Sequence, residues 1–157
     1  CKTEKGNEDK DMNIENALRH YLLQQNEVRN VLGNHIYAGR IPRGERPVIA
    51  ALITRMSTQR YNDLSGEDGI VSPTLEIEFV SKAGNAPALA LKAAEQVRLK
   101  VSCYAGTWGP ANDLIYVHSC TVERDVMKEP VWQDDEWSFS YSMDLRVTHS
   151  QTAVATP

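Results

Sequence analysis

The sequence predicts an α+β fold, in which a four-stranded antiparallel sheet carries two main helices packed on one face. Two stretches, 13–25 and 86–101, place apolar residues at the three- and four-residue spacing of amphipathic helices. The stretch 137–147 alternates strictly between large apolar residues and small or polar ones, which is the pattern of a half-buried strand. The strands follow one another in hairpin-linked pairs, and this order favours antiparallel pairing.

The first predicted helix begins after Asn13, whose side chain can cap it, and ends near Gln25. Its apolar stripe consists of Ile14, Ala17, Leu18, Tyr21 and Leu22. A short second helical turn covers 27–32 and stops at Gly33. The following segment, 35–47, is rich in glycine and proline, so we expect an irregular crossing without regular structure.

Four strands are predicted, at 48–57, 74–80, 114–123 and 137–147. A polar hairpin loop at 61–69 joins the first two, and the helix at 86–101 follows the second. The apolar face of the last strand consists of Trp137, Phe139, Tyr141, Met143, Leu145 and Val147. Because side chains alternate across a strand, all six should point at the helices.

The chain is long enough, at 157 residues, for one domain that buries a core without metals or disulfides. We expect a charged N-terminal extension at 1–11, a single domain at 12–148 and a polar C-terminal tail at 149–157. The extension begins with Cys1 and carries seven charged residues. A cysteine followed by a charged tether leaves a lipid-anchored periplasmic binding domain open as an alternative class.

Composition excludes several classes of protein. The net charge is −4 and the basic residues form no dense cluster, which argues against tight binding to nucleic acid. The longest apolar run, 48–53, is far shorter than a membrane span. The three cysteines, Cys1, Cys103 and Cys120, lack the spacing of a disulfide framework or a zinc site.

Catalytic and metal-binding motifs are also missing from the sequence. It contains no GxSxG, HExxH or GxGxxG motif and no phosphate-binding loop. The histidines His20, His35, His118 and His149 include no pair at metal-ligand spacing. A calcium loop that starts at Asp63 would put Asp68 where the sharp turn requires glycine. The sequence therefore predicts a protein that is not an enzyme and needs no metal or cofactor.

Three arginines, Arg40, Arg43 and Arg46, lie in the crossing segment. They could bind a phosphate, remain solvated, or pair with carboxylates of a neighbouring subunit such as Glu67 or Asp135. We predict the last of these if the arginines have a role, because a planar guanidinium can hold a carboxylate with two hydrogen bonds.

The segment 124–136 joins two predicted strands and is much longer than the roughly 2 to 5 residues that a hairpin needs. It contains Met127, Val131 and Trp132 among charged residues, a composition typical of an interface with a polar rim. We predict an assembly arm that docks on a neighbouring subunit or an adjoining protein. The alternative is a loop that folds back and buries Trp132 in the core of its own chain.

The order of Leu32, Gly33, Ile36, Tyr37, Arg40 and Pro42 is followed by the helix ALALKAAEQVRLKV and the closing strand WSFSYSMDLRVTH. This order resembles the family of tail-terminator and tail-completion proteins of long-tailed bacteriophages and prophages. The resemblance spans about 12–148. Two features depart from the family pattern: the segment before Met12, and the long apolar loop at 124–136.

The resemblance implies a homo-oligomeric ring, commonly a hexamer, at the head-proximal end of the tail. Such a ring terminates the tail tube and joins tail to head, so its partners are the tail tube protein and a head-completion or connector protein. DNA passes through its lumen without specific binding, and no membrane, cofactor or catalytic residue is implied. The location is the virion, after assembly in the host cytoplasm. A head-completion or neck ring of the same virion remains the alternative.

Overall fold

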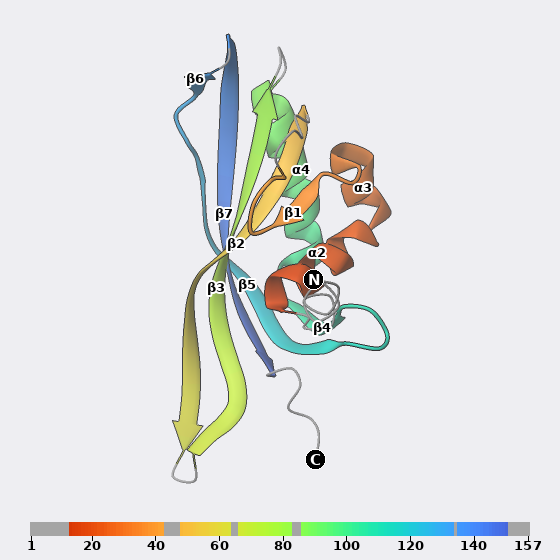
Figure 1. Cartoon of the computed structure of the whole chain (residues 1–157), viewed down its shortest axis with the longest axis vertical. Helices are drawn as coiled ribbons and strands as arrows, with labels where there is room; N and C mark the ends of the chain where they lie inside the picture. The colour runs from red at the N-terminus through yellow and green to blue at the C-terminus, as the bar shows by residue number, and fades with distance from the viewer. Residues whose placement is uncertain (1–12, 43–47, 64–65, 83–85, 134, 151–157) are drawn as a thin grey trace, which may run out of the picture.

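The computed structural model describes residues 13–42, 48–63, 66–82, 86–133 and 135–150 (Figure 1). The predicted N-terminal extension and residues 151–157 lie outside this part of the chain. The elements in chain order are α2 (Ile14–Leu23), α3 (Asn26–Leu32), β1 (Ile36–Ala38), β2 (Ile49–Asp63), β3 (Gly66–Lys82), α4 (Ala86–Val101), β4 (Tyr104–Trp108), β5 (Ile115–Met127), β6 (Val131–Gln133) and β7 (Glu136–Ser150).

The strands form one seven-stranded sheet in the order β1-β2-β3-β7-β5-β4, and β6 pairs with the start of β7. β1 runs parallel to β2, whereas all other pairs are antiparallel. The predicted fold, a four-stranded antiparallel sheet with two main helices, is therefore wrong. The described chain has a mixed sheet of seven strands with three helices, and most of it is β-structure.

The three unpredicted strands are short. β1 and β6 have 3 residues each and β4 has 5, which is too short for a side-chain alternation to stand out. β1 lies inside the segment that was expected to be irregular, and it begins with the buried Ile36. Short strands at the edges of a sheet limit the number of unpaired backbone groups there.

The four predicted strands exist but continue further than expected. β2 and β3 pair through the predicted polar loop as far as Asp63 and Gly66. β3 pairs with β7 only from Ile70 onward, so the rest of the β2–β3 hairpin projects as two strands (Figure 1). β5 continues to Met127 and β6 follows it, so the prediction of a long loop at 124–136 is wrong.

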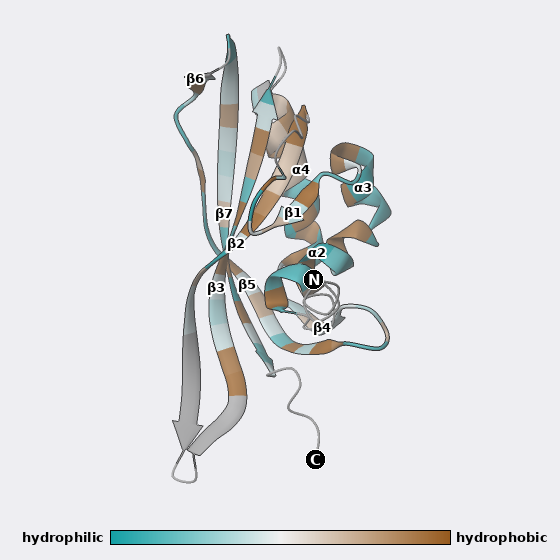
Figure 2. Ribbon diagram, viewed as in Figure 1, coloured by the Kyte–Doolittle hydropathy of each residue, from teal (hydrophilic) through white to brown (hydrophobic). Residues whose placement is uncertain are grey.

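The helices α2, α3 and α4 lie along one face of the sheet (Figure 1). α2 begins where Asn13 caps it, since the Asn13 side chain accepts a 2.8 Å hydrogen bond from the Asn16 N–H. The core fills the layer between these helices and the sheet, and Figure 2 shows hydrophobic residues on β2 and β3 beside the helices. Its sheet side includes Leu75, Ile77, Phe79, Met143, Leu145 and Val147, which are all fully buried.

The apolar face of β7 is divided between two environments. Met143, Leu145 and Val147 are buried in the core, as the alternation predicts. Phe139 and Tyr141 are half-buried, and Trp137 is 51% exposed because β7 continues past the end of α4 (Figure 1). The prediction that all six side chains pack against the helices is thus wrong for Trp137.

Candidate functional site

The end of β5, the strand β6 and the start of β7 form a narrow extension at one end of the molecule (Figure 1). We call residues 126–137 the arm. The register of β6 on β7 pairs Val131 with Ser138, Trp132 with Trp137, and Gln133 with Glu136. Asp135 adopts a left-handed backbone conformation, φ 62°, in the turn between the two strands, which suits a tight hairpin.

Two tryptophans face each other across the arm. Trp132 is 57% exposed and Trp137 is 51% exposed, and their ring centroids lie 5.3 Å apart at an interplanar angle of 70°. This edge-to-face arrangement is a favourable geometry for aromatic rings. Trp132 is not part of the core of its own chain, so the alternative of a loop that folds back to bury it is wrong.

The arm is apolar on both faces. Met127 pairs with Tyr141, whose hydroxyl contacts Arg98 of α4, so Met127 lies on the helix side of the sheet. The two-residue period places both tryptophans on this same side, and it places Val126 and Val131 on the other. All five of these side chains are exposed. A small domain that leaves a contiguous apolar surface uncovered commonly uses it to contact a partner.

Polar contacts fix the base of the arm from both faces. The Lys128 N–H donates a 2.9 Å hydrogen bond to the Ser140 carbonyl, and the Lys128 ammonium lies 3.2 Å from a Glu78 carboxylate oxygen and 3.8 Å from one of Glu76. On the helix side, Arg98 of α4 forms an ion pair with Asp125. Partly exposed pairs contribute little stability individually. Together they hold the direction of the arm relative to β3 and α4.

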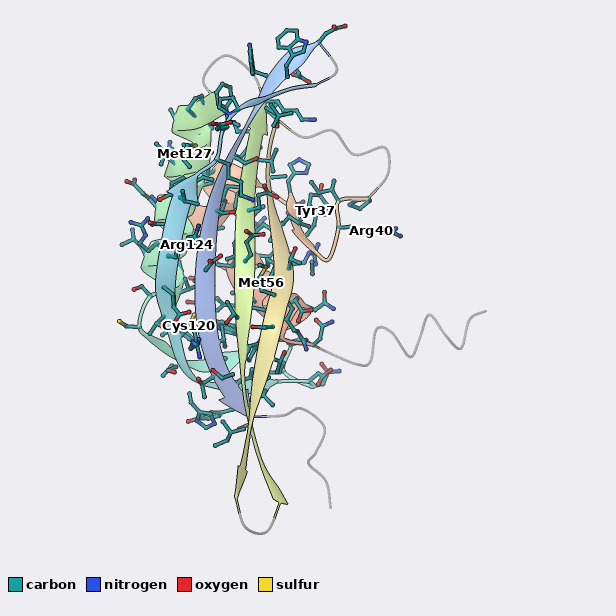
Figure 3. All side chains as sticks on the ribbon, turned by 90° about the vertical axis from the view of Figure 1, so that its left-hand side faces the viewer. Tyr37, Arg40, Met56, Cys120, Arg124 and Met127 are labelled. Carbon is teal, nitrogen blue, oxygen red and sulfur yellow. The ribbon has the colours of Figure 1, made fainter. Side chains whose placement is uncertain are left out.

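Of the three predicted arginines, the structure describes Arg40, which lies toward the other edge of the sheet (Figure 3). Arg40 is exposed and comes directly after β1 and Gly39, whereas Arg43 and Arg46 lie outside the described residues. Figure 3 shows Arg40 and Met127 toward opposite edges. The structure therefore does not bring Arg40 together with the arm of the same chain.

Val48, just before β2, lies at the same height along the strands as the arm but is separated from it by β3 and β7. Its carbonyl accepts a 2.8 Å hydrogen bond from the Lys82 N–H, and Lys82 pairs with Ser138 of β7. The side chain of Val48 is 54% exposed.

Groups that could carry out chemistry are scattered. Within the described residues, no three histidine, cysteine or acidic side chains are close enough together to hold a metal ion. Burial raises the pKa of the Cys120 thiol to about 12, so it remains protonated and unreactive at neutral pH. None of the helices in the same part of the chain is long and apolar enough to cross a membrane.

His149 is a buried titratable group near the end of β7. Burial lowers the pKa of its imidazole, and Arg55 nearby acts in the same direction, while a 2.6 Å hydrogen bond to the Ser150 carbonyl opposes them. Below the ordinary histidine pKa of about 6.5, the unfolded chain therefore takes up a proton more readily than the folded one. The stability from the neutral imidazole is present above that pH and is lost as the pH falls through the lower folded pKa.

The melting temperature should therefore fall between about pH 7 and pH 5, and the fall should be smaller in His149→Gln. Thermal unfolding followed by circular dichroism at several pH values measures both proteins under the same conditions. An equal fall in the two proteins would show that His149 does not contribute to the pH dependence.

Comparisons with solved structures identify chains of similar fold. Neither a family model nor a curated protein matches the sequence. The fold is similar to that of a chain from the virion of a native gene transfer agent particle, with a TM-score of 0.64 and 15% sequence identity. The similarity covers 86% of this chain and 94% of that chain. At this identity, it shows a shared fold alone.

Proposed function

We propose that this chain is a non-enzymatic structural subunit of a phage-like virion. In this proposal it forms a ring at the head-proximal end of the tail, where it terminates the tail tube and joins tail to head. The observation that carries the proposal is the shared fold, which extends over 94% of a chain from a gene transfer agent virion. The order of residues that resembles tail-terminator proteins supports the specific position in the particle.

The surface of the molecule also supports an assembly role. The arm exposes apolar side chains on both faces, and Trp132 with Trp137 form a rigid pair of the residue type most often found at the centre of interfaces. Closed rings bury such surfaces by repeating one contact around an axis. The net charge of −4 is compatible with a lumen through which DNA passes without binding.

The oligomeric state of the purified full chain tests the ring. Native mass spectrometry and negative-stain images at micromolar concentration should show a closed ring, with six copies as the expected number. A protein that remains monomeric at every concentration would contradict the proposal. Particles made without the protein test its position: tail tubes of uncontrolled length, unattached to heads, are expected. Tails of normal length would instead indicate the head-completion or neck alternative.

Trp132→Ala should abolish the ring and change the free energy of unfolding by no more than about 1.5 kcal/mol. The side chain is more than half exposed, so the monomer loses only its contact with Trp137. Tyr116→Ala is the matched control, because Tyr116 is also 57% exposed but lies away from the arm on β5. This control should form rings as the wild type does. Intact rings in Trp132→Ala would contradict the role of the arm.

A further inference from the structure

We infer that neighbouring copies in the ring join edge to edge, so that β5 of one copy pairs with β2 of the next and the sheet continues between them. The two segments are 121–127 of β5 and 54–63 of β2. Figure 3 shows Arg124 and Met127 of β5 along one edge of the sheet, and β2 lies toward the other. The occupant of each edge is a second copy of the same chain. This inference rests on the proposed ring and names the contact that builds it.

Both segments have a free edge. Within the described residues, β4 pairs with β5 only between Ile115 and Cys120, so 121–127 has β7 on one side and no strand on the other. The described β1 pairs with β2 only at 51–53, which leaves 54–63 with β3 as its single described neighbour. A strand edge with unpaired N–H and C=O groups is a template for pairing with another strand.

The directions of the two strands fit this contact. Antiparallel pairs connect β2 to β3, β3 to β7 and β7 to β5, so β2 and β5 run in opposite directions. A copy rotated about an axis that runs along the sheet therefore presents β2 antiparallel to β5, and antiparallel pairing is slightly the more stable arrangement. The same contact can repeat around the axis until the ring closes.

The free segments are offset along the strands. Arg124, the middle residue of 121–127, is level with Thr54 of β2 through its register partners on β7 and β3. The middle of 54–63 lies about 4 to 5 residues further along β2, roughly 13 to 16 Å at 3.3 Å per residue. A partner copy displaced by this amount brings the two segments together. The parts covered by β1 and β4 then lie beyond the two ends of the contact.

Closing a sheet around an axis requires a displacement of this size. Each copy adds β2, β3, β7 and β5 to the continuous sheet, a width of roughly 19 Å at about 4.8 Å per strand. Strands in a closed sheet tilt by roughly 35 to 45° from the axis, and this tilt displaces the next copy along the strands by roughly 13 to 19 Å. The offset of the two free segments lies within this range.

A contact between two β5 edges is less favourable. Antiparallel pairing of 121–127 with itself over its full length places the two Arg124 side chains opposite each other and Glu123 opposite Asp125. Like charges directly opposite each other destabilise a sheet. Such a pair is also complete with two copies and cannot continue into a ring.

Backbone amides at the free edge of β5 report the contact directly. The Lys128 N–H donates a hydrogen bond to Ser140, so the alternation along the strand points the N–H groups of Asp125 and Met127 away from β7. In a single copy these two amides have no strand partner among the described residues and should exchange rapidly with deuterium. In the ring they bond to β2 of the next copy, and the whole of 121–127 should be protected.

Hydrogen–deuterium exchange of the wild-type ring, measured by mass spectrometry on peptic fragments, is the first test. We expect slow exchange at every amide of 121–127 and throughout 54–63. Rapid exchange at every second amide of 121–127 in an intact ring overturns the edge contact. Protection of 121–127 without protection of 54–63 also overturns it, since β5 would then pair with another surface.

Proline at position 125 is the second test, with Asp125→Ala as the matched control. Both variants lose the ion pair with Arg98, but only Asp125→Pro loses the outward N–H. Proline is tolerated in an edge strand where its nitrogen faces solvent, so the two melting curves should be close. In native mass spectrometry, Asp125→Pro should need at least about a tenfold higher protein concentration than Asp125→Ala to form rings. Equal concentrations contradict the contact.

The outcomes separate the contact from the ring. A wild-type ring whose free edges exchange rapidly leaves the proposed function in place and removes the edge contact. A wild type that never assembles overturns the proposed function and this contact with it. If Asp125→Pro does not fold, the exchange experiment decides, because it uses the unmodified chain.

Discussion

Phe79→Ala is expected to destabilise the fold by about 3 to 5 kcal/mol. Phe79 is fully buried on β3, and its register partners are Ala51 of β2 and Tyr141 of β7. Removing its ring leaves a cavity in the core between the sheet and the helices, which the hydrogen-bonded strands cannot close by moving. Urea unfolding at equilibrium measures the loss as a lower transition midpoint with an unchanged slope.

Phe139→Ala provides the matched control. Phe139 carries the same side chain on the neighbouring strand β7, but it is only half-buried. The Phe139 side chain loses less of its apolar surface to the interior when the chain folds, so the Phe139→Ala change should cost less than about 2 kcal/mol. Equal losses of unfolding free energy in the two variants would mean that the core extends to the first residues of β7, where the arm begins.

Gly109→Ala is expected to cost about 2 to 5 kcal/mol, the second largest effect. Gly109 lies between β4 and β5 with φ 109°, a conformation that L-amino acids rarely adopt. A Cβ atom there would lie 2.7 Å from the Asp113 carbonyl oxygen, which belongs to the backbone and cannot rotate away. Both the backbone conformation and the close contact therefore oppose a side chain.

Gly39→Ala separates these two causes. Gly39 has φ 90°, but a Cβ atom added to it would meet no heavy atom within 4 Å. Its cost should reflect the backbone conformation alone, about 1 to 3 kcal/mol. Thermal or urea unfolding of both variants gives the difference. A cost at Gly39 as large as that at Gly109 would show that the contact with Asp113 contributes nothing.

The helices could be located from the sequence because their signals are local. Asn13 caps α2 as predicted, and α4 occupies 86–101 as predicted. A cap and a stripe of apolar residues depend only on neighbours along the chain, so they can be recognised before anything is known of the sheet. The central parts of the four long strands were located as well, because the alternation of apolar and polar residues along a strand is also a local pattern.

The sheet could not be derived in this way. β1 has only 3 residues, and its place beside β2 depends on the contact of Ile36 with Ala51, which are 15 positions apart in the chain. A parallel pairing leaves no hairpin signal, because the strands are not joined by a tight turn. The lengths of β2 and β3 were underestimated because part of their hairpin extends beyond the pairing with β7, and its polar sequence shows no apolar alternation.

The candidate site was predicted in part. Trp132 stood out because an apolar segment between charged residues has no reason to remain exposed on a monomer. Trp137 was assigned to the core, since it continues the alternation of β7 without a break. Alternation identifies the face of a strand but not how far the helices cover it. The level of Val48 relative to the arm depends on pairing across β3 and β7, and no local pattern contains this information.

The place of β7 in the sheet has a consequence for biosynthesis. β7 is the last of the described strands in sequence order, yet it lies between β3 and β5 and joins the two parts of the sheet. While the ribosome is still making the protein, β2 and β3 can form a hairpin, but β4 and β5 have no strand to attach to it. The core therefore closes only after β7 has been synthesised. A chain released early would expose its apolar strands, so incomplete products are expected to be cleared by proteases before they can enter an assembly.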